Sequence, residues 1–296
     1  HSMYWIWKTY ANYNKTWAGK HNFGAMAGWE MTRSSWNGHT IIKTNFSTDD
    51  IFVMTQDGRF SSNNGWKDSQ TMASAFARLN YNYDERYYAT VTFRADASSK
   101  FGANKKWGFF PSGAFKWNLS KEQWVRKLNF FQDLSLRLSA GRTGNDAIAA
   151  YTSLYSIASS TGGYLIGGSQ ATYHYPNRLA SPNLTWETTD MFNAALDVAI
   201  FRGRLKFTLE GYYALTKDLL LNVQKAQHTG YDSYRENLGR TSNKGVELSI
   251  ESKNILKKNF SWTTDFTLAH NSQLVEDIGT EDFVVTYKGE KDYMMY

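Results

Sequence analysis

Apolar and polar side chains alternate with a period of two along several segments of about ten residues. One segment places Tyr87, Ala89, Val91, Phe93 and Ala95 on one face and Tyr88, Thr90, Thr92, Arg94 and Asp96 on the other. The pattern returns in residues 192–200 and 205–213, on either side of a short Arg202-Gly203-Arg204 turn. Successive side chains of a β-strand point to opposite faces, and a tilted strand needs about ten residues to cross a bilayer. The alternation therefore predicts transmembrane β-strands.

The connections between the expected strands are alternately short and long. We expect ten strands, at about residues 4–17, 21–32, 70–83, 86–97, 111–119, 133–141, 192–200, 205–213, 246–251 and 260–268. Long connections are expected at residues 33–69, 98–110, 142–183 and 219–241. Short turns on one side and long loops on the other are typical of outer-membrane barrels. The fold class that we predict is all-β, an antiparallel transmembrane β-barrel with short periplasmic turns and long extracellular loops.

Hydropathy alone does not select this fold. The mean hydropathy is −0.54, and no run of about eighteen uncharged apolar residues could form a transmembrane helix. A polar lumen and polar loops would dilute the lipid-facing residues of a barrel to such a value. A soluble all-β domain would also show it, so the soluble class stays open as an alternative.

Composition excludes several kinds of chemistry. The chain has no cysteine, so thiol nucleophiles, disulfides and cysteine-based zinc sites are impossible. The net charge of +6 comes from scattered basic residues, so we expect no nucleic-acid surface. The six histidines lack metal-ligand spacing, and we expect no metal site and no cofactor. Four carboxylates on expected strands could include a glycosidase pair, but a hydrated barrel interior explains them better: Glu187, Glu210, Glu247 and Glu251.

Several collinear blocks resemble the SusC/RagA-type TonB-dependent outer-membrane transporters of Bacteroidetes. The first block runs from Tyr83-Asp84-Glu85-Arg86-Tyr87-Tyr88 through Ala97-Ser98-Ser99-Lys100-Phe101-Gly102 to Trp107-Gly108-Phe109-Phe110-Pro111-Ser112. The later blocks are Leu136-Arg137-Leu138-Ser139-Ala140-Gly141-Arg142-Thr143-Gly144-Asn145, Ser181-Pro182-Asn183-Leu184-Thr185-Trp186-Glu187, Thr216-Lys217-Asp218-Leu219-Leu220 and Asn243-Lys244-Gly245-Val246-Glu247-Leu248. The series covers nearly the whole chain.

The resemblance implies a 22-stranded barrel in the outer membrane, plugged by an N-terminal domain and driven by TonB. It also implies a SusD-like lipoprotein partner and import of oligosaccharides or peptides. Because we expect about ten strands, we interpret residues 1–296 as a partial barrel domain without its plug. TonB would then act through the missing N-terminal part, and residues 288–296 would belong to a mid-barrel loop. Such a transporter is not an enzyme.

Aromatic residues in the expected external loops are the candidate substrate-binding residues: Trp36, Tyr155, Tyr164, Tyr173 and Tyr175. Flat rings stack on sugar faces or pack against a lid protein. The alternative function is a soluble or secreted all-β carbohydrate-binding module or glycosidase. The two differ in where the apolar faces of residues 87–95 and 192–200 point: into a packed core, or outward as a continuous belt.

Overall fold

The computed structural model describes residues 1–47, 58–224, 231 and 233–279. Its strands form one antiparallel ten-stranded sheet with the order β1-β2-β3-β4-β5-β6-β9-β10-β11-β12, and a separate β7-β8 hairpin. The strands are β1 (Ser2–Trp17), β2 (His21–Thr44), β3 (Arg59–Tyr83), β4 (Tyr87–Ser98), β5 (Trp107–Asn118), β6 (Phe131–Asn145), β7 (Ser156–Ile166), β8 (Ser169–Arg178), β9 (Glu187–Ile200), β10 (Leu205–Gln224), β11 (Ser233–Lys257) and β12 (Phe260–Asp277).

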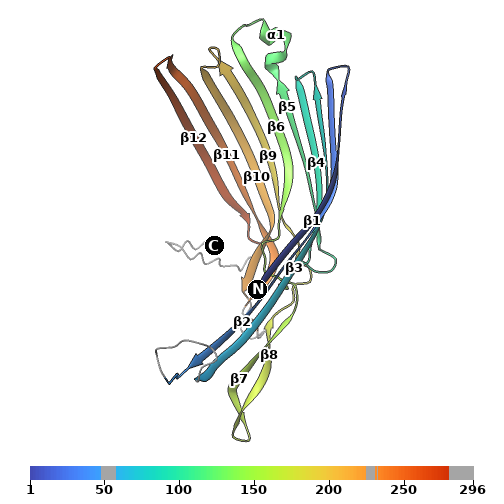
Figure 1. The fold of residues 1–296 in the computed structure, drawn as a ribbon, viewed down its shortest axis with the longest axis vertical. Coiled ribbons are helices and arrows are strands. Elements are labelled where there is room, and N and C mark those ends of the chain that lie inside the picture. The colour runs from blue at the N-terminus through green and yellow to red at the C-terminus, as the bar shows by residue number, and fades with distance from the viewer. Residues whose placement is uncertain (48–57, 225–230, 232, 280–296) are drawn as a thin grey trace.

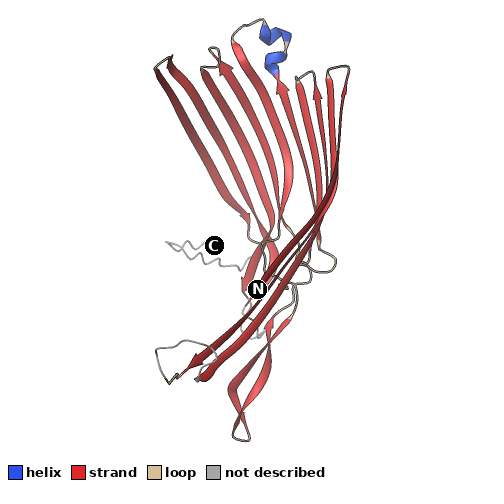
Figure 2. Ribbon diagram, in the orientation of Figure 1, coloured by secondary structure: helices blue, strands red, loops and turns tan. Residues whose placement is uncertain are grey.

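The short and long connections lie at opposite ends of the sheet. Within the ten-stranded sheet the tight turns gather at the upper end in Figure 1, together with the longer β5-β6 connection that contains the short helices η1 (Leu119–Lys121) and α1 (Gln123–Arg126). The β7-β8 hairpin and the far ends of β2 and β3 extend from the lower end. Figure 2 shows that almost everything else is strand. Among the described residues, no helix is long and apolar enough to cross a membrane.

The register of the ten strands joins like side chains into rows. One row of cross-strand partners crosses the whole sheet and consists of Trp17, His21, Tyr83, Tyr87, Trp117, Leu136, Leu196, Leu209, Leu248 and Leu268. The adjacent row on the other face consists of Thr16, Asn22, Asn82, Tyr88, Lys116, Arg137, Ala195, Glu210, Glu247 and Ala269. The period-two alternation of the sequence is thus a two-faced sheet.

The apolar face is exposed. Val91, Phe192 and Leu268 on this face are 57%, 59% and 58% exposed, so no second layer packs on them. A soluble β-sandwich would bury such a face, because each Å² of apolar surface removed from water stabilises the fold by about 25 cal/mol. The exposure of this face indicates a lipid-facing belt and argues against the alternative of a soluble all-β domain. The predicted antiparallel barrel sheet is confirmed, with ten strands in an open arc.

A tight turn joins β9 to β10, as predicted at Arg202-Gly203-Arg204. Phe201, Arg202 and Gly203 have φ angles of 53°, 57° and 75°, in the left-handed region. The Gly203 amide donates a hydrogen bond of 3.1 Å to the Ile200 carbonyl. Primed hairpin turns need these angles because they match the right-handed twist of the strands, and glycine adopts them without a Cβ penalty.

Several predicted loops are in fact paired strands. We expected a loop at residues 33–69, but β2 continues to Thr44 and β3 begins at Arg59, so the two form a long ribbon. The expected loop 142–183 contains the β7-β8 hairpin, and β10 and β11 extend into the expected loop 219–241. Backbone pairing continues there although the apolar alternation that a bilayer imposes has ended. The expected mid-barrel loop at residues 288–296 lies outside the described residues.

Candidate transport conduit and external binding surface

Charged groups pair with one another on the polar face, opposite the lipid-facing belt. Arg137 on β6 donates two hydrogen bonds, of 2.7 and 3.1 Å, to the two carboxylate oxygens of Asp197 on β9. Its guanidinium also lies 3.7 Å from Glu210 on β10, whose other carboxylate oxygen accepts a hydrogen bond from the Asn193 amide. The hydroxyl of Thr208 donates to Asp197 at 2.9 Å. Three neighbouring strands are thereby joined by one polar network.

A second polar cluster lies on the same face of β2, β3 and β4. Arg94 donates from Nε to Asp96 at 2.8 Å and from a terminal nitrogen to Ser74 at 3.0 Å. Glu30 lies between two cations, with Lys8 at 3.5 Å and Arg94 at 4.0 Å. Because each carboxylate here has a cation partner, these groups suit a hydrated channel wall.

The carboxylates singled out in the sequence all lie on strands, at the lumen-facing positions that we expected. Glu210 and Glu247 stand directly opposite one another on β10 and β11. Glu187 accepts a hydrogen bond from the Asn145 amide and another from the Leu220 backbone amide. Within the described part of the chain, no three histidine or acidic side chains lie close enough together to hold a metal ion.

A small hydrophobic core ties the external connections to the sheet. Its buried members are Phe101, Phe110, Ile148, Leu184, Trp186 and Leu220. The Trp186 indole donates a 2.8 Å hydrogen bond to the Lys106 carbonyl. Asn237 reaches across from β11, accepting from the Thr185 amide at 2.8 Å and donating to the Thr185 carbonyl at 2.9 Å. The core therefore holds the connections that follow β4, β6 and β8 against the ends of β10 and β11.

Glycine is required where this core is tightest. A Cβ added at Gly102 would stand 2.0 Å from the Pro182 carbonyl oxygen, far inside van der Waals contact. A Cβ at Gly144 would stand 2.1 Å from the Phe110 ring. Both glycines belong to blocks that the sequence analysis singled out, so those blocks encode the packing of the external connections.

The five candidate residues lie on β2, on or just before β7, and on β8. Trp36 is not in a loop but in the β2-β3 ribbon, and it contacts none of the other candidate rings that the structure describes. Tyr155 precedes β7, and its side chain is hydrogen-bonded to that of Tyr231. Tyr164 lies on β7, and its side chain is outside the described part of the structure. Tyr173 and Tyr175 lie two residues apart on β8, with ring centroids 5.8 Å apart.

A hydrogen-bonded girdle at the short-turn end was not foreseen. The Tyr87 hydroxyl and the Trp117 indole both donate to one oxygen of Glu122, at 2.8 and 3.1 Å. These hydrogen bonds, first that of Tyr87, hold the pKa of Glu122 below its ordinary value, and the nearby guanidinium of Arg86 acts in the same direction. The sequence does show the aromatic cluster at strand ends, but the 35-residue separation of Tyr87 and Glu122 hides their contact.

Comparison with known proteins identifies the kind of sheet. The family described as "TonB dependent receptor-like, beta-barrel" matches residues 2–290. The TonB-dependent receptor P39 of Formosa agariphila is 33% identical over 277 residues, which are 93% of this chain and 26% of that protein. The TonB-dependent receptor SusC of Bacteroides thetaiotaomicron is 31% identical over 278 residues, which are 92% of this chain and 27% of that protein. The chain thus spans about a quarter of the length of these relatives.

Solved structures share the fold. The RagAB peptide importer in its closed-closed state gives a TM-score of 0.86 at 24% identity, over 95% of this chain and 31% of that one. The siderophore receptor PirA from Acinetobacter baumannii gives 0.53 at 16% identity, over 91% of this chain and 36% of that one. The two-faced sheet, the alternating connection lengths and the match over residues 2–290 agree. The chain belongs to the β-barrel family of TonB-dependent receptors, which are proteins of the outer membrane and not enzymes.

Proposed function

We propose that this chain forms ten neighbouring strands of a larger, 22-stranded barrel. Within the part of the chain that the structure describes, β1 and β12 each pair on one side only. Open sheet edges do not persist in the hydrocarbon layer, because each unpaired backbone group there costs several kcal/mol. Further strands that continue the sheet at both edges would remove this cost. The plug domain and the segment that contacts TonB would then belong to other parts of the receptor.

The function that we propose is active import of a nutrient across the outer membrane, powered through TonB. The observation that carries it is the single sheet with an outward apolar belt, a charged inner wall and the β7-β8 hairpin and the extended ends of β2 and β3 projecting from one end. No covalent chemistry is needed. Substrate binding at the external end and movement of a plug would do the work, and the paired charges of the wall would keep the conduit hydrated.

The proposed substrates are oligosaccharides or peptides, captured together with a SusD-like lipoprotein. The relationship to SusC and the fold shared with a peptide importer support this choice. Trp36, Tyr155, Tyr164, Tyr173 and Tyr175 remain the proposed substrate contacts or lid contacts. Among them Tyr175 is the best placed, because it is 41% exposed and its ring lies beside that of Tyr173 on the projecting hairpin.

The proposal is tested by deleting the complete gene and measuring growth on a panel of oligosaccharides and peptides as sole nutrients. We expect growth to fail on one class of substrate and to return when the gene is restored. Uptake of the fluorescently labelled substrate should stop when the proton-motive force is dissipated. Loss of growth on none of the panel, or uptake that is independent of the proton-motive force, would contradict the proposal. Affinity purification of the tagged receptor should recover a lipoprotein, which separates the partner from the transport activity.

A further inference from the structure

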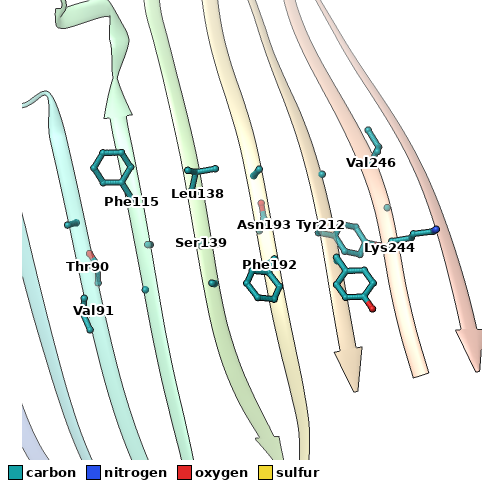
Figure 3. Close-up of a pocket in the computed structure, with 18 of the residues that line it drawn as sticks. Thr90, Val91, Phe115, Leu138, Ser139, Phe192, Asn193, Tyr212, Lys244 and Val246 are labelled. Carbon is teal, nitrogen blue, oxygen red and sulfur yellow. The ribbon is translucent and has the colours of Figure 1, made fainter. Parts of the chain in front are cut away.

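The lipid-facing surface of the central strands is hollowed. Figure 3 shows this hollow, of about 1070 Å³, with Val91, Phe115, Leu138, Phe192 and Val246 around it, contributed by β4, β5, β6, β9 and β11. Small residues line its floor: Gly113, Ala140, Ala194 and Gly211. A Cβ added at Gly113 or Gly211 would find no atom nearer than 3.9 Å. The missing side chains therefore leave a space that larger residues could fill without backbone strain.

A second hollow, of about 560 Å³, continues the first toward the external end. The two share Gly113, Ala140, Phe192 and Tyr213 in their linings. Beyond Phe192 the lining changes from apolar residues to Arg142, Asp190 and Lys217. One groove thus has an apolar floor and a charged end.

The charged end carries more cations than anions. Arg142 donates to both oxygens of Asp190, at 2.6 and 2.9 Å, and Lys217 donates to the same carboxylate at 3.3 Å. On the adjacent strand Lys244 lines the larger hollow, and no described carboxylate lies within ion-pair distance of it. Arg240, opposite Lys217 in the register, lies 3.9 Å from Asp277. The carboxylate of Asp218 also acts on Arg142, so three carboxylates accompany four cations, and Lys244 supplies the excess.

These cations lie where the apolar belt ends. On β9 the outward side chains are apolar from Ile200 to Phe192, and Asp190 follows. Eight residues rise about 26 Å along a strand, and a tilt near 40° reduces this to roughly 20 Å across the membrane. Because the cations are on the side of the long connections, they lie at the headgroup level of the outer leaflet.

We propose that this groove binds a phosphorylated lipid of the outer leaflet. An acyl chain lies on the floor that Gly113 and Gly211 help to form, and a phosphate lies at Lys217 and Lys244. Cations at headgroup level attract anionic lipids, and ammonium and guanidinium groups form charge-assisted hydrogen bonds to phosphate oxygens. A second copy of this face is a poorer occupant. A two-fold interface would place the same excess of positive charge against itself. The inference depends on the position in the outer membrane and not on the transport activity.

The test uses the complete receptor, purified from outer membranes in mild detergent. Lipid retained by the protein is identified and counted by mass spectrometry, and binding is then measured with diphosphorylated lipid A and with net-neutral phosphatidylethanolamine. One variant removes the charges (Lys217→Met with Lys244→Met), and another fills the floor (Gly113→Phe with Gly211→Phe). The matched controls are Lys20→Met in the turn after β1 and Gly65→Phe on β3, since a Cβ at Gly65 has ordinary 3.6 Å contacts. Heat-modified gel migration verifies that each barrel is folded.

We expect the wild type and both controls to retain lipid A. The charge variant and the floor variant should each bind it at least tenfold more weakly, and an excess of inorganic phosphate should not displace it. Equal retention of lipid A by all the variants would overturn the proposal. So would equal binding of phosphatidylethanolamine by the wild type, or a change of oligomeric state in the variants without loss of lipid. If a variant does not fold, the comparison of the two lipids on the wild type still decides.

Discussion

Arg137 on β6 and Asp197 on β9 meet through two parallel hydrogen bonds, of 2.7 and 3.1 Å, on the polar face of the sheet. Leu136 and Leu196, the neighbours of these two residues in the chain, are cross-strand partners on the opposite, lipid-facing side. One register therefore fixes a charged wall and an apolar belt at once. A shift by one residue would turn both faces inside out.

Removing the cation of this pair should destabilise the barrel. For Arg137→Met we expect a loss of about 1–2 kcal/mol, since hydrogen bonds to charged groups contribute about 1.5–3 kcal/mol and the exposure of Arg137 reduces this. The free energy of unfolding of the receptor, measured by urea titration in lipid vesicles, checks the prediction. The double variant Arg137→Met with Asp197→Asn should lose less, because no uncompensated carboxylate remains. A larger loss in the double variant would show that the pair is not the source of the effect.

A charge on the lipid-facing belt should lower the free energy of unfolding far more than the same charge one residue away. Val91→Arg places a guanidinium on the apolar face of β4, near the middle of the belt, and should reduce the free energy of unfolding by about 2–4 kcal/mol. Thr92→Arg, on the polar face of the same strand, should cost less than about 1 kcal/mol. Leu196→Arg on β9 should behave like Val91→Arg. Equal effects at positions 91 and 92 would mean that the faces are assigned the wrong way.

The turn between β9 and β10 should reject β-branched residues. Gly203 has a φ of 75°, and a β-branched side chain in this left-handed region costs roughly 1–2 kcal/mol. We expect Gly203→Val to slow barrel folding and to lower stability by this amount, whereas Gly203→Asn should be nearly neutral because asparagine tolerates such angles. Folding is followed by heat-modified gel migration over time. Identical rates for valine and asparagine would contradict the role of the turn.

Acid should weaken the girdle at the short-turn end. Because hydrogen bonds from Tyr87 and Trp117 lower the pKa of Glu122 in the folded state, its ionised form stabilises the fold. This contribution is complete above the pKa of about 4.3 of an unfolded glutamate, and it is lost as the pH falls through the lower folded-state value. Stability measured between about pH 7 and pH 3 should show this decline, and Glu122→Gln should remove that part of it. A variant with the wild-type pH profile would exclude Glu122 as the source.

The ring of Tyr175 should matter to substrate capture more than its hydroxyl. Tyr175→Ala should weaken uptake affinity about tenfold, which corresponds to the roughly 0.5–1.5 kcal/mol of an aromatic contact together with its buried area. Tyr175→Phe keeps the ring and should retain most of the affinity. Uptake of labelled substrate over a concentration series gives both values. Wild-type uptake by the alanine variant would remove Tyr175 from the proposed contacts.

The sequence was sufficient for the sheet because a bilayer imposes a simple rule. Val91 faces lipid and Thr92 faces the lumen, and this alternation between apolar and polar residues repeats along each strand. Tight turns such as Phe201–Arg204 are recognised by their glycine and by the interruption of the apolar–polar alternation. The ten strands of the barrel sheet and its two faces follow from such local signals, whereas the β7-β8 hairpin does not.

The sequence was insufficient where the bilayer ends. The β2-β3 ribbon beyond Arg33 pairs through its backbone, and polar side chains such as those of Asn37 and Lys67, which lie opposite each other, give no alternation to recognise. The external core was missed for another reason. Phe101 and Trp186 are 85 positions apart in the chain, and only the folded sheet brings their rings to 5.2 Å. Contacts between distant segments leave no periodic trace.

The row that runs from Trp17 to Leu268 begins among interfacial rings and finishes among aliphatic residues, so it climbs through the membrane as it passes around the arc. Each strand is therefore set at its own height by its neighbour. An insertion or deletion in one membrane-crossing strand would displace every strand after it, whereas an insertion in an external connection would displace none. Evolution within this family should accordingly have altered lengths at the external end and kept the crossings constant, which leaves the receptor free to acquire new ligands without rebuilding its wall.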